Sequence, residues 1–533
     1  IEYKYEYGTT QGGPYPNATT PVTAAAGQPS EVTITGLQPN TRYYYRMVYD
    51  GDGDVDDGDF EARAEHSFWT QRARGEGFTF TVTSDSHGTF GSTTATHILN
   101  GSPDFSVDLG DTFMIDTLSE TQSAYNSRYV TWRGSGYFGG IGPSVPIYLA
   151  TGNHEEEEGW NLNDSPSRSV LNIEARKLYF PHPVSDGFYT ANADTLASLT
   201  GDQLREDYYA WAWGDALFVV IDPFQYTLSL PYSGGPSEEN DEGTPTYDQW
   251  TWTLGQTQYN WLKDTLENSD AAYKFVFSHQ MVGGIPDYVG TAGADYVRGG
   301  ARAAGYFELG GYDEDGTTWA FDTKRPGWGV DAEHPNGTPI HQLFVDNGVS
   351  AYFHGHDHQY VYEKRGSVVY QEVPSPSMSG TGFDGIYYEG TYTEYSTIER
   401  LGGPGHLRVT ITPTQATVQY ISSSGSNNYS YTIEPSTPVV THDLTMAVNP
   451  EGAGTTSPPV GTHARAENSV VNISATGALG YAFSSWTGDV ADVNAASTTV
   501  TMDSDKTVTA NFTTVPTYVL TTAVSPEGAG TIS

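Results

Sequence analysis

The sequence lacks cysteine altogether, so its 533 residues contain no disulfide framework and no thiolate metal site. Basic residues are scarce: 24 lysines and arginines stand against 65 acidic residues, and the formal charge is −41. A general nucleic-acid binder needs a basic footprint, and docking on an anionic membrane needs positive charge, so the composition argues against both functions. No apolar run approaches the roughly 18–20 residues of a membrane span.

Aromatic residues, by contrast, are abundant. They form 13% of the chain and include 38 tyrosines, and a hydrophobic share of 37% is enough for a sizeable core. Wholesale disorder is therefore not expected. Frequent glycine (60) and proline (30) without a fixed period predict many turns and short strands. The length predicts roughly three or four domains of about 150 residues each.

The negative charge predicts a soluble protein whose field would repel anionic substrates. An enzyme acting on phosphates would then need strong local positive charge, which bound metal ions supply. The chain begins at Ile1 and contains no signal peptide, so we interpret it as a processed form or a fragment of a longer precursor.

Residues 1–74 have the pattern of short β-strands separated by turn residues. The stretch from Leu37 to Tyr43 resembles the corner of fibronectin type III domains at which a tyrosine locks a loop. The resemblance implies a β-sandwich over residues 1–74 whose first strands would precede Ile1.

Five aspartates alternate with small residues near the end of this region: Asp50, Asp52, Asp54, Asp56 and Asp59. Oxygen ligands at alternate positions are what Ca²⁺ requires of a loop. The glycine and the terminal glutamate of an EF-hand are not in register, however. Two interpretations therefore stand, a Ca²⁺ site and a merely solvated acidic turn.

Residues 76–433 have a different sequence pattern, in which predicted apolar strands alternate with helical or irregular stretches. One predicted helix, over residues 255–269, places Tyr259, Leu262 and Leu266 on one face. Alternation of this kind predicts an α/β core in which helices flank β-sheets.

The C-terminal region contains a repeat. After a Pro/Thr-rich linker over residues 434–442, LTMAVNPEGAGT at 444–455 returns as LTTAVSPEGAGT at 520–531. Such a period indicates tandem small domains, predicted over 443–513 and from 518 to 533. With GYAFSSWTGD and KTVTANF, the first copy resembles the internalin B-repeats of secreted bacterial proteins. This implies a secreted or cell-surface protein, attached through its repeats.

Five polar clusters each follow an apolar strand of the central region. They contain Asp85 and His87, then Asp111, then Asn153 and His154, then His279, and finally His356 and His358. In an open α/β sheet, ligands bind beyond the carboxyl ends of the strands, so distant clusters can converge. Singly, each has an ordinary interpretation, such as a helix cap for Asp111 or a buried His279. Together, their oxygen and nitrogen ligands favour Fe, Zn or Mn.

The ordered set Asp-X-His, Gly-Asp, Gly-Asn-His-Glu, His and Gly-His-X-His is identified as the signature of the calcineurin-like metallophosphoesterases. The arrangement resembles their purple acid phosphatase branch, in which a fibronectin-like domain also precedes the core. The resemblance implies two transition-metal ions. Their ligands would be Asp85, His87 and His358 for the first, Asn153, His279 and His356 for the second, Asp111 as the bridge, and His154 would face the substrate.

The chain departs from the purple branch at two positions. That branch has a metal-bound tyrosine three residues after the bridging aspartate, and Met114 stands there instead. The branch also lacks the histidine of Asp-X-His, which is His87 here. Because the purple colour comes from tyrosinate on ferric iron, we expect no purple colour, and a Mn, Zn or mixed Fe site is as plausible as a ferric–divalent pair.

Two metal ions about 3.5–4 Å apart would clamp the attacking and leaving oxygens while a hydroxide held on them attacks phosphorus. His154 would protonate the leaving group. Glu155 either orients His154 or is one of the solvated acids of the HEEEE run. Three arginines between the last two motifs, Arg298, Arg302 and Arg325, either contact phosphate or form structural salt bridges.

The sequence thus predicts a multidomain α+β protein with a β-sandwich, a central α/β metallophosphoesterase sandwich and small β-repeat domains. We expect a secreted phosphomonoesterase acting on a phosphate-ester substrate. A phosphodiesterase or nucleotidase would use the same site, and a surface or matrix protein carrying a phosphoesterase core is the third alternative. The intact ligand set argues against the third.

Overall fold

The computed structural model describes residues 1–50, 60–88, 92–134, 136–228, 253–282, 300–301, 340–378, 390–391, 396–436, 441–467 and 470–515. Two compact units emerge from the contacts. The first comprises Ile1–Arg72 and Gly77–Pro438, and the second comprises Ala73–Glu76 and Val439–Ser533. In the part of the chain that is described, no helix combines the length and the apolar character that crossing a membrane requires.

The N-terminal strands form one six-stranded sheet around the antiparallel pair β1–β4. Its members are β1 (Glu2–Gly8), β2 (Asn17–Ala18), β3 (Val22–Thr23), β4 (Arg42–Asp50), β5 (Glu61–Ala62) and β6 (His66–Trp69). The Tyr43 hydroxyl accepts a hydrogen bond from the Gln38 backbone N–H at 3.0 Å, as a loop-locking tyrosine would. The described strands make a single sheet, so the sandwich and its fibronectin identity stay predictions.

The predicted Ca²⁺ loop falls largely outside the described residues. Asp50 is buried at the end of β4, whereas Asp52, Asp54, Asp56 and Asp59 are not described. The choice between a Ca²⁺ site and a solvated turn therefore stays a prediction.

Two sheets form the centre of the first unit. The six-stranded sheet has the order β21 (Asn427–Ile433), β20 (Ala416–Ser422), β19 (Gly405–Ile411), β7 (Phe78–Thr83), β8 (Phe105–Asp108) and β9 (Ile147–Leu149). The nine-stranded sheet has the order β10 (Thr190–Ala191), β11 (Tyr209–Trp213), β12 (Ala216–Val220), β13 (Tyr273–Phe277), β14 (Ala351–His354), β16 (Val368–Glu372), β15 (Tyr360–Arg365), β18 (Ser396–Leu401) and β17 (Gly390–Thr391). Strands β7, β8 and β9 are parallel, as are β12, β13, β14 and β16.

An aromatic layer joins these two sheets. Phe80 and Phe105 from the first sheet meet Phe218 from the second edge-on, with ring centroids 5.1 and 5.0 Å apart. Edge-to-face packing of this kind adds about 0.5–1.5 kcal/mol per pair beyond the burial of area. The sheets are therefore fixed face to face.

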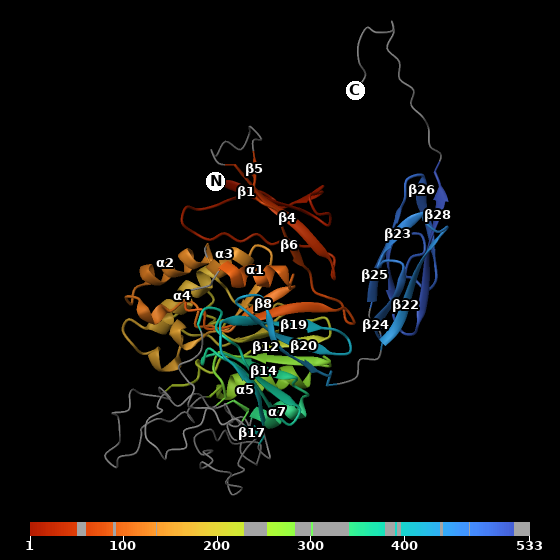
Figure 1. The fold of residues 1–533 in the computed structure, drawn as a ribbon. Coiled ribbons are helices and arrows are strands. Elements are labelled where there is room, and N and C mark those ends of the chain that lie inside the picture. The colour runs from red at the N-terminus through yellow and green to blue at the C-terminus, as the bar shows by residue number, and fades with distance from the viewer. Residues whose placement is uncertain are drawn as a thin grey trace, which may run out of the picture. The chain divides into compact units, whose positions relative to one another are not determined.

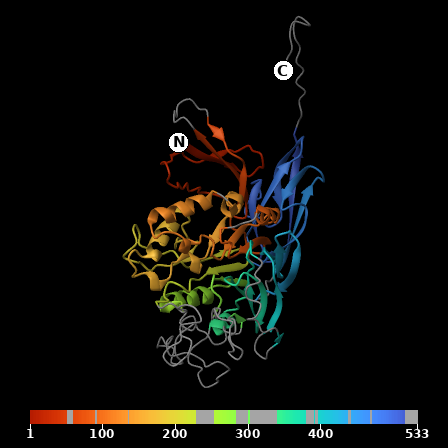
Figure 2. The same cartoon turned by 60° about the vertical axis from the view of Figure 1, so that its left-hand side comes forward.

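Helices cover the outer face of each sheet (Figures 1 and 2). On one side lie α1 (Ser92–Asn100), α2 (Gln122–Arg133), α3 (Gly136–Ile141) and α4 (Arg168–Tyr179), and on the other lie α5 (Gly255–Glu267) and α7 (Ile340–Asp346). Short 3₁₀ turns are η1 (Ile115–Thr117), η2 (Asn153–Glu155) and η3 (Gly159–Asn161). The predicted face of α5 is confirmed, because Tyr259, Leu262 and Leu266 are all buried in the core.

The second unit is a small β-domain with its own core. A four-stranded sheet contains β24 (Gly461–Ala466), β22 (Thr441–Asn449), β28 (Lys506–Thr514) and β26 (Tyr481–Thr487), and a three-stranded sheet contains β23 (Gly454–Ser457), β25 (Val470–Gly477) and β27 (Ser497–Thr501). Met446, Trp486 and Val508 are among its buried residues. Strand β22 begins at Thr441, inside the predicted linker. The predicted second repeat, 518–533, lies outside the described residues.

Candidate metal centre

The predicted ligands follow the carboxyl ends of parallel strands in both central sheets. Asp85 and His87 come after β7, Asp111 after β8 and Asn153 after β9, whereas His279 comes after β13, and His356 and His358 after β14. The first four belong to the six-stranded sheet and the last three to the nine-stranded sheet. A site that they share must therefore lie where the edges of the two sheets meet.

The first group consists of Asp85, His87 and His358. One ligand atom from each lies within 4.8 Å of the others. His358 Nε2 is 3.5 Å from Asp85 Oδ1, and the rings of His87 and His358 are 4.8 Å apart at their centroids. These three residues can share one cation.

The second group centres on His279, which is fully buried. Its Nε2 lies 3.2 Å from Asp111 Oδ2, 3.1 Å from Asn153 Oδ1 and 3.2 Å from His356 Nδ1. Its other nitrogen, Nδ1, lies 3.1 Å from the carbonyl of Leu109. Donation from Nδ1 to that carbonyl leaves Nε2 free to bind a metal, which is the usual arrangement of a ligand histidine.

Asp111 connects the two groups. It belongs with His279 and His356, and also with His87 and His154, in sets whose ligand atoms lie within 4.8 Å. The two groups also approach each other directly, because His279 Nε2 is 3.9 Å from Asp85 Oδ1. All seven residues predicted from the sequence are thus brought together, with Asp111 in the position expected of a bridge.

The chemistry of these side chains fits a pair of transition-metal ions. Among the described residues, Asp85 Oδ1 and His87 Nε2 are buried without a hydrogen-bond partner, a costly state for polar atoms unless they bind something else. The donors are imidazole nitrogens and carboxylate or amide oxygens, which suit Fe, Zn or Mn. The residues present therefore fit the metals that the sequence predicts.

The charges of the site are arranged in opposed pairs. Burial alone would lower the pKa of His279, but the carboxylates of Asp111 and Asp85 raise it to about 9. Burial alone would raise the pKa of Asp111, but the neighbouring histidines, His279 first, hold it well below its usual range. Strong mutual stabilisation of this kind is typical of functional sites.

The backbone of the ligand loops is unusual. Positive φ angles occur at Asp85 (56°), His87 (46°), Asp111 (52°), His356 (83°) and His358 (64°). For residues other than glycine this region costs of order 1–3 kcal/mol each, and such residues gather at functional sites. The sequence gives no sign of this strain.

Gly355 is required by its surroundings. A Cβ added there would lie 1.9 Å from Ser84 Oγ and 2.7 Å from Asp85 Oδ2. Because Gly355 has no side chain, the next residue can approach the β7 loop, and the His356 N–H donates a hydrogen bond to Asp85 Oδ2 at 2.9 Å. Gly355 thus permits the close contact between the loop after β14 and the loop after β7.

His154 lies beside Asp111 and pairs with a residue that the sequence reasoning missed. Its Nδ1 is 2.8 Å from Asp116 Oδ2, and its Nε2 is 3.8 Å from Asp111 Oδ2. Burial would lower the pKa of His154, but the charges of Asp111 and Asp116 raise it. Asp116 is in η1, five residues after Asp111. In the sequence, the only indication of its role is that it is a second acid close to the predicted bridging aspartate.

Glu155 is buried, with 3% of its surface exposed, and accepts hydrogen bonds from backbone N–H groups of the ligand loops. The interpretation as a solvated acid is therefore wrong. Met114, at the position of the purple branch's tyrosine, has a φ of 50°, and its carbonyl accepts a hydrogen bond from Arg128 Nη1 at 3.0 Å. Arg298, Arg302 and Arg325 lie outside the described residues, so their roles stay predictions.

Comparison with known families agrees with this geometry. The sequence model of the family described as calcineurin-like phosphoesterase matches residues 78–360, more than half of the chain. The chain belongs to the calcineurin-like phosphoesterases. The matched region spans every strand that precedes a predicted ligand, from β7 to β14.

Two solved structures are similar to this chain at low sequence identity. A solved structure of PhoD has a TM-score of 0.51 at 16% identity, over 81% of this chain and 82% of that one. A purple acid phosphatase from yellow lupin (Lupinus luteus) seeds has a TM-score of 0.46 at 14% identity, over 81% of this chain and 69% of that one. None of the curated proteins matches the chain. The divergent InlB B-repeat domain matches residues 444–516, which confirms the predicted repeat resemblance.

Proposed function

We propose that this calcineurin-like phosphoesterase is a secreted enzyme that hydrolyses phosphomonoesters with two transition-metal ions. One observation carries the proposal: ligand atoms from five strand ends gather around Asp111 in two overlapping sets. The absence of cysteine and the InlB-type repeat are consistent with a secreted or surface-attached protein.

Seven side chains would hold the metal ions: Asp85, His87 and His358 the first, Asn153, His279 and His356 the second, and Asp111 both. Bound there, the ions would supply the nucleophile and neutralise the charge on the phosphate oxygens. A dianionic substrate needs this positive charge, because the chain itself carries −41.

His154 would donate the proton that the leaving alkoxide takes up. Its Nε2 faces Asp111, and its Nδ1 lies 2.8 Å from the Asp116 carboxylate. Donation from Nδ1 to Asp116 fixes the ring and favours the protonated imidazole, which is the form that a general acid requires. His154 is half-buried, so its ring can be reached by a substrate at the metal centre.

The first test measures metal content and hydrolysis together. The purified protein should contain about two transition-metal ions and hydrolyse p-nitrophenyl phosphate, and chelation should abolish hydrolysis until metal is restored. Asp111→Ala should lose at least one ion and nearly all activity, because it removes the shared ligand. Full activity in the Asp111→Ala variant would contradict the proposal.

The same preparation distinguishes a monoesterase from a diesterase. Metal-replete protein should have a higher kcat/KM on p-nitrophenyl phosphate than on bis(p-nitrophenyl) phosphate. The reverse order would establish the phosphodiesterase alternative.

A further inference from the structure

The Glu155 carboxylate accepts four backbone hydrogen bonds. Oε2 accepts from the N–H groups of Asp111 and Gly152, each at 2.8 Å. Oε1 accepts from Thr112 at 2.9 Å and from Phe113 at 2.8 Å. One side chain thus joins the loop after β8 to the loop after β9.

These two loops contain the residues on which the proposed reaction depends. The β8 loop contains Asp111, and the β9 loop contains Asn153 and His154. They also meet directly, because the His154 N–H donates to Asp111 Oδ1 at 2.8 Å. A Cβ on Gly152 would lie 2.3 Å from Asp111 Oδ1 and 2.8 Å from Glu155 Oε2, so only glycine fits between them.

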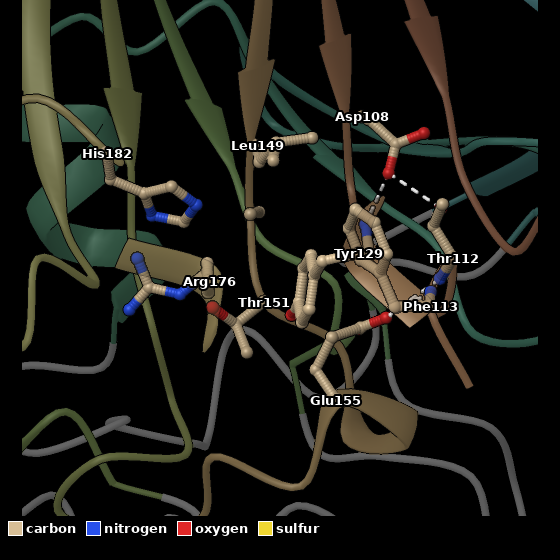
Figure 3. A pocket seen from close by; sticks show the side chains of 11 residues that line it. Asp108, Thr112, Phe113, Tyr129, Leu149, Thr151, Glu155, Arg176 and His182 are labelled. Atoms are coloured by element: carbon tan, nitrogen blue, oxygen red, sulfur yellow. Dashed lines mark hydrogen bonds between the residues drawn. The ribbon is translucent and has the colours of Figure 1, made fainter. Parts of the chain in front are cut away.

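A second buried carboxylate holds the β8 loop from another side. Asp108 Oδ1 accepts from Thr112 Oγ1 at 2.9 Å and from the Gly110 N–H at 3.2 Å. Figure 3 shows Thr112 between Asp108 and Glu155. Ser86 Oγ donates to Thr112 Oγ1 at 3.1 Å, which extends this support to the Asp85–His87 loop.

The four donors require a carboxylate rather than any polar group. An ionised glutamate offers two acceptor oxygens, whereas glutamine offers one oxygen and an amide that is itself a donor. In a glutamine variant, the side-chain amide N–H groups would therefore face some of the backbone N–H donors, and those donors would lose their acceptor. Because Asp111 has a φ of 52°, its strained conformation persists only while its surroundings hold it.

We propose that Glu155 is a positioning residue whose carboxylate sets the place of Asp111 between the two metal ions. The proposal rests on the proposed function for the role of Asp111, and it assigns to Glu155 no contact with substrate. It differs from the interpretation in which Glu155 orients His154, since the four bonds go to backbone groups and three of them go to the β8 loop.

The test compares Glu155→Gln with Glu158→Gln. Glu158 is another buried glutamate of the same HEEEE run, but its Oε2 accepts from the side chain of Asn161 at 3.0 Å, within its own loop. Chelated protein is titrated with Mn²⁺ or Zn²⁺ alone, and thermal unfolding is recorded with and without metal. We expect Glu155→Gln to bind metal about 10–100-fold more weakly and to lose most of the metal-induced rise in Tm, because the hydrogen bonds that hold a ligand in place are lost. Glu158→Gln should behave as the wild type.

A merely structural role gives a different result. It would lower Tm equally with and without metal and leave the metal affinity unchanged, and that outcome overturns the proposal. The readout is metal affinity, so it is separate from the test of function: wild-type protein that binds metal but hydrolyses no phosphoester would overturn the proposed function alone.

If Glu155→Gln does not fold, Glu155→Asp takes its place. Aspartate keeps the charge but is shorter by one methylene, so it cannot reach all four donors. We expect weaker metal binding with native circular dichroism. Wild-type metal affinity in Glu155→Asp would overturn the proposal.

Discussion

Asp116 is the residue that changes the chemical interpretation of the site most. Burial alone would lower the pKa of His154, but the carboxylates of Asp111 and of Asp116, which lies 2.8 Å from its Nδ1, raise it. The pair leaves Nε2 as the only nitrogen directed at the metal centre. The proposed acid function thus depends on two residues from two loops.

Removing either member of this pair should reduce turnover without removing the metals. We expect His154→Ala to keep its metal content and to lose about 10²–10⁴-fold in kcat, the usual contribution of a positioned acid. Asp116→Asn, which keeps the size but not the charge, should lose about 10–100-fold. Metal analysis and steady-state kinetics check both; loss of metal from His154→Ala would make it a ligand instead.

At this scale the candidate ligands can be recognised in the sequence, whereas the residues that support them cannot. Motif residues such as Asp85, His279 and His358 are recognisable because their chemistry is rare in that order. Asp116 and Glu155 are ordinary acids in the sequence, and only their three-dimensional partners give them roles. The positive φ angles at Asp85 and Asp111 are equally invisible, since they arise from how the loops meet.

At the scale of elements, the strands were predictable and the turns after them were not. Short runs rich in aromatic and β-branched residues predict strands, and β7, β8, β12 and β14 lie within such runs. The turns depend on contacts between strands distant in sequence. Gly355, for example, is fixed by Ser84, some 270 residues earlier in the chain.

Gly355→Ala should damage the junction of these two loops. The added methyl group would overlap Ser84 Oγ and crowd Asp85, and overpacking of this kind costs about 1–3 kcal/mol. We expect a lower Tm together with weakened metal binding. Gly134→Ala is the matched control, because the nearest atom that its Cβ would meet in the described part of the chain is the Val130 carbonyl oxygen, at 3.9 Å. Equal effects in the two variants would contradict the assignment.

For the whole molecule, charge is the dominant property. A formal charge of −41 surrounds a site that must receive phosphate esters, so long-range repulsion should slow their binding. Salt screens such repulsion over about 8–10 Å at physiological ionic strength. The C-terminal repeat domain was predictable from the repeated sequence, and a family model matches it over residues 444–516. The predicted division near residue 76, the N-terminal sandwich and the acidic loop stay predictions.

Raising NaCl from low to moderate concentration should therefore raise kcat/KM. The increase should be steeper for p-nitrophenyl phosphate, which carries up to two negative charges, than for its bis ester, which carries one. Metal content is measured at each salt concentration as the control. A falling kcat/KM, or equal slopes for the two substrates, would show that the overall field does not govern substrate binding.

The division of the ligands between two sheets has a consequence for biogenesis. Asp85, His87, Asp111 and Asn153 are synthesised well before His279, His356 and His358, and each proposed ion needs ligands from both sets. A nascent chain that ends before residue 356 lacks proposed ligands of both ions, and one that ends before residue 358 still lacks a ligand of the first. With the proposed ligands, metal would enter only after most of the phosphoesterase region has been translated, in whichever compartment the complete chain folds.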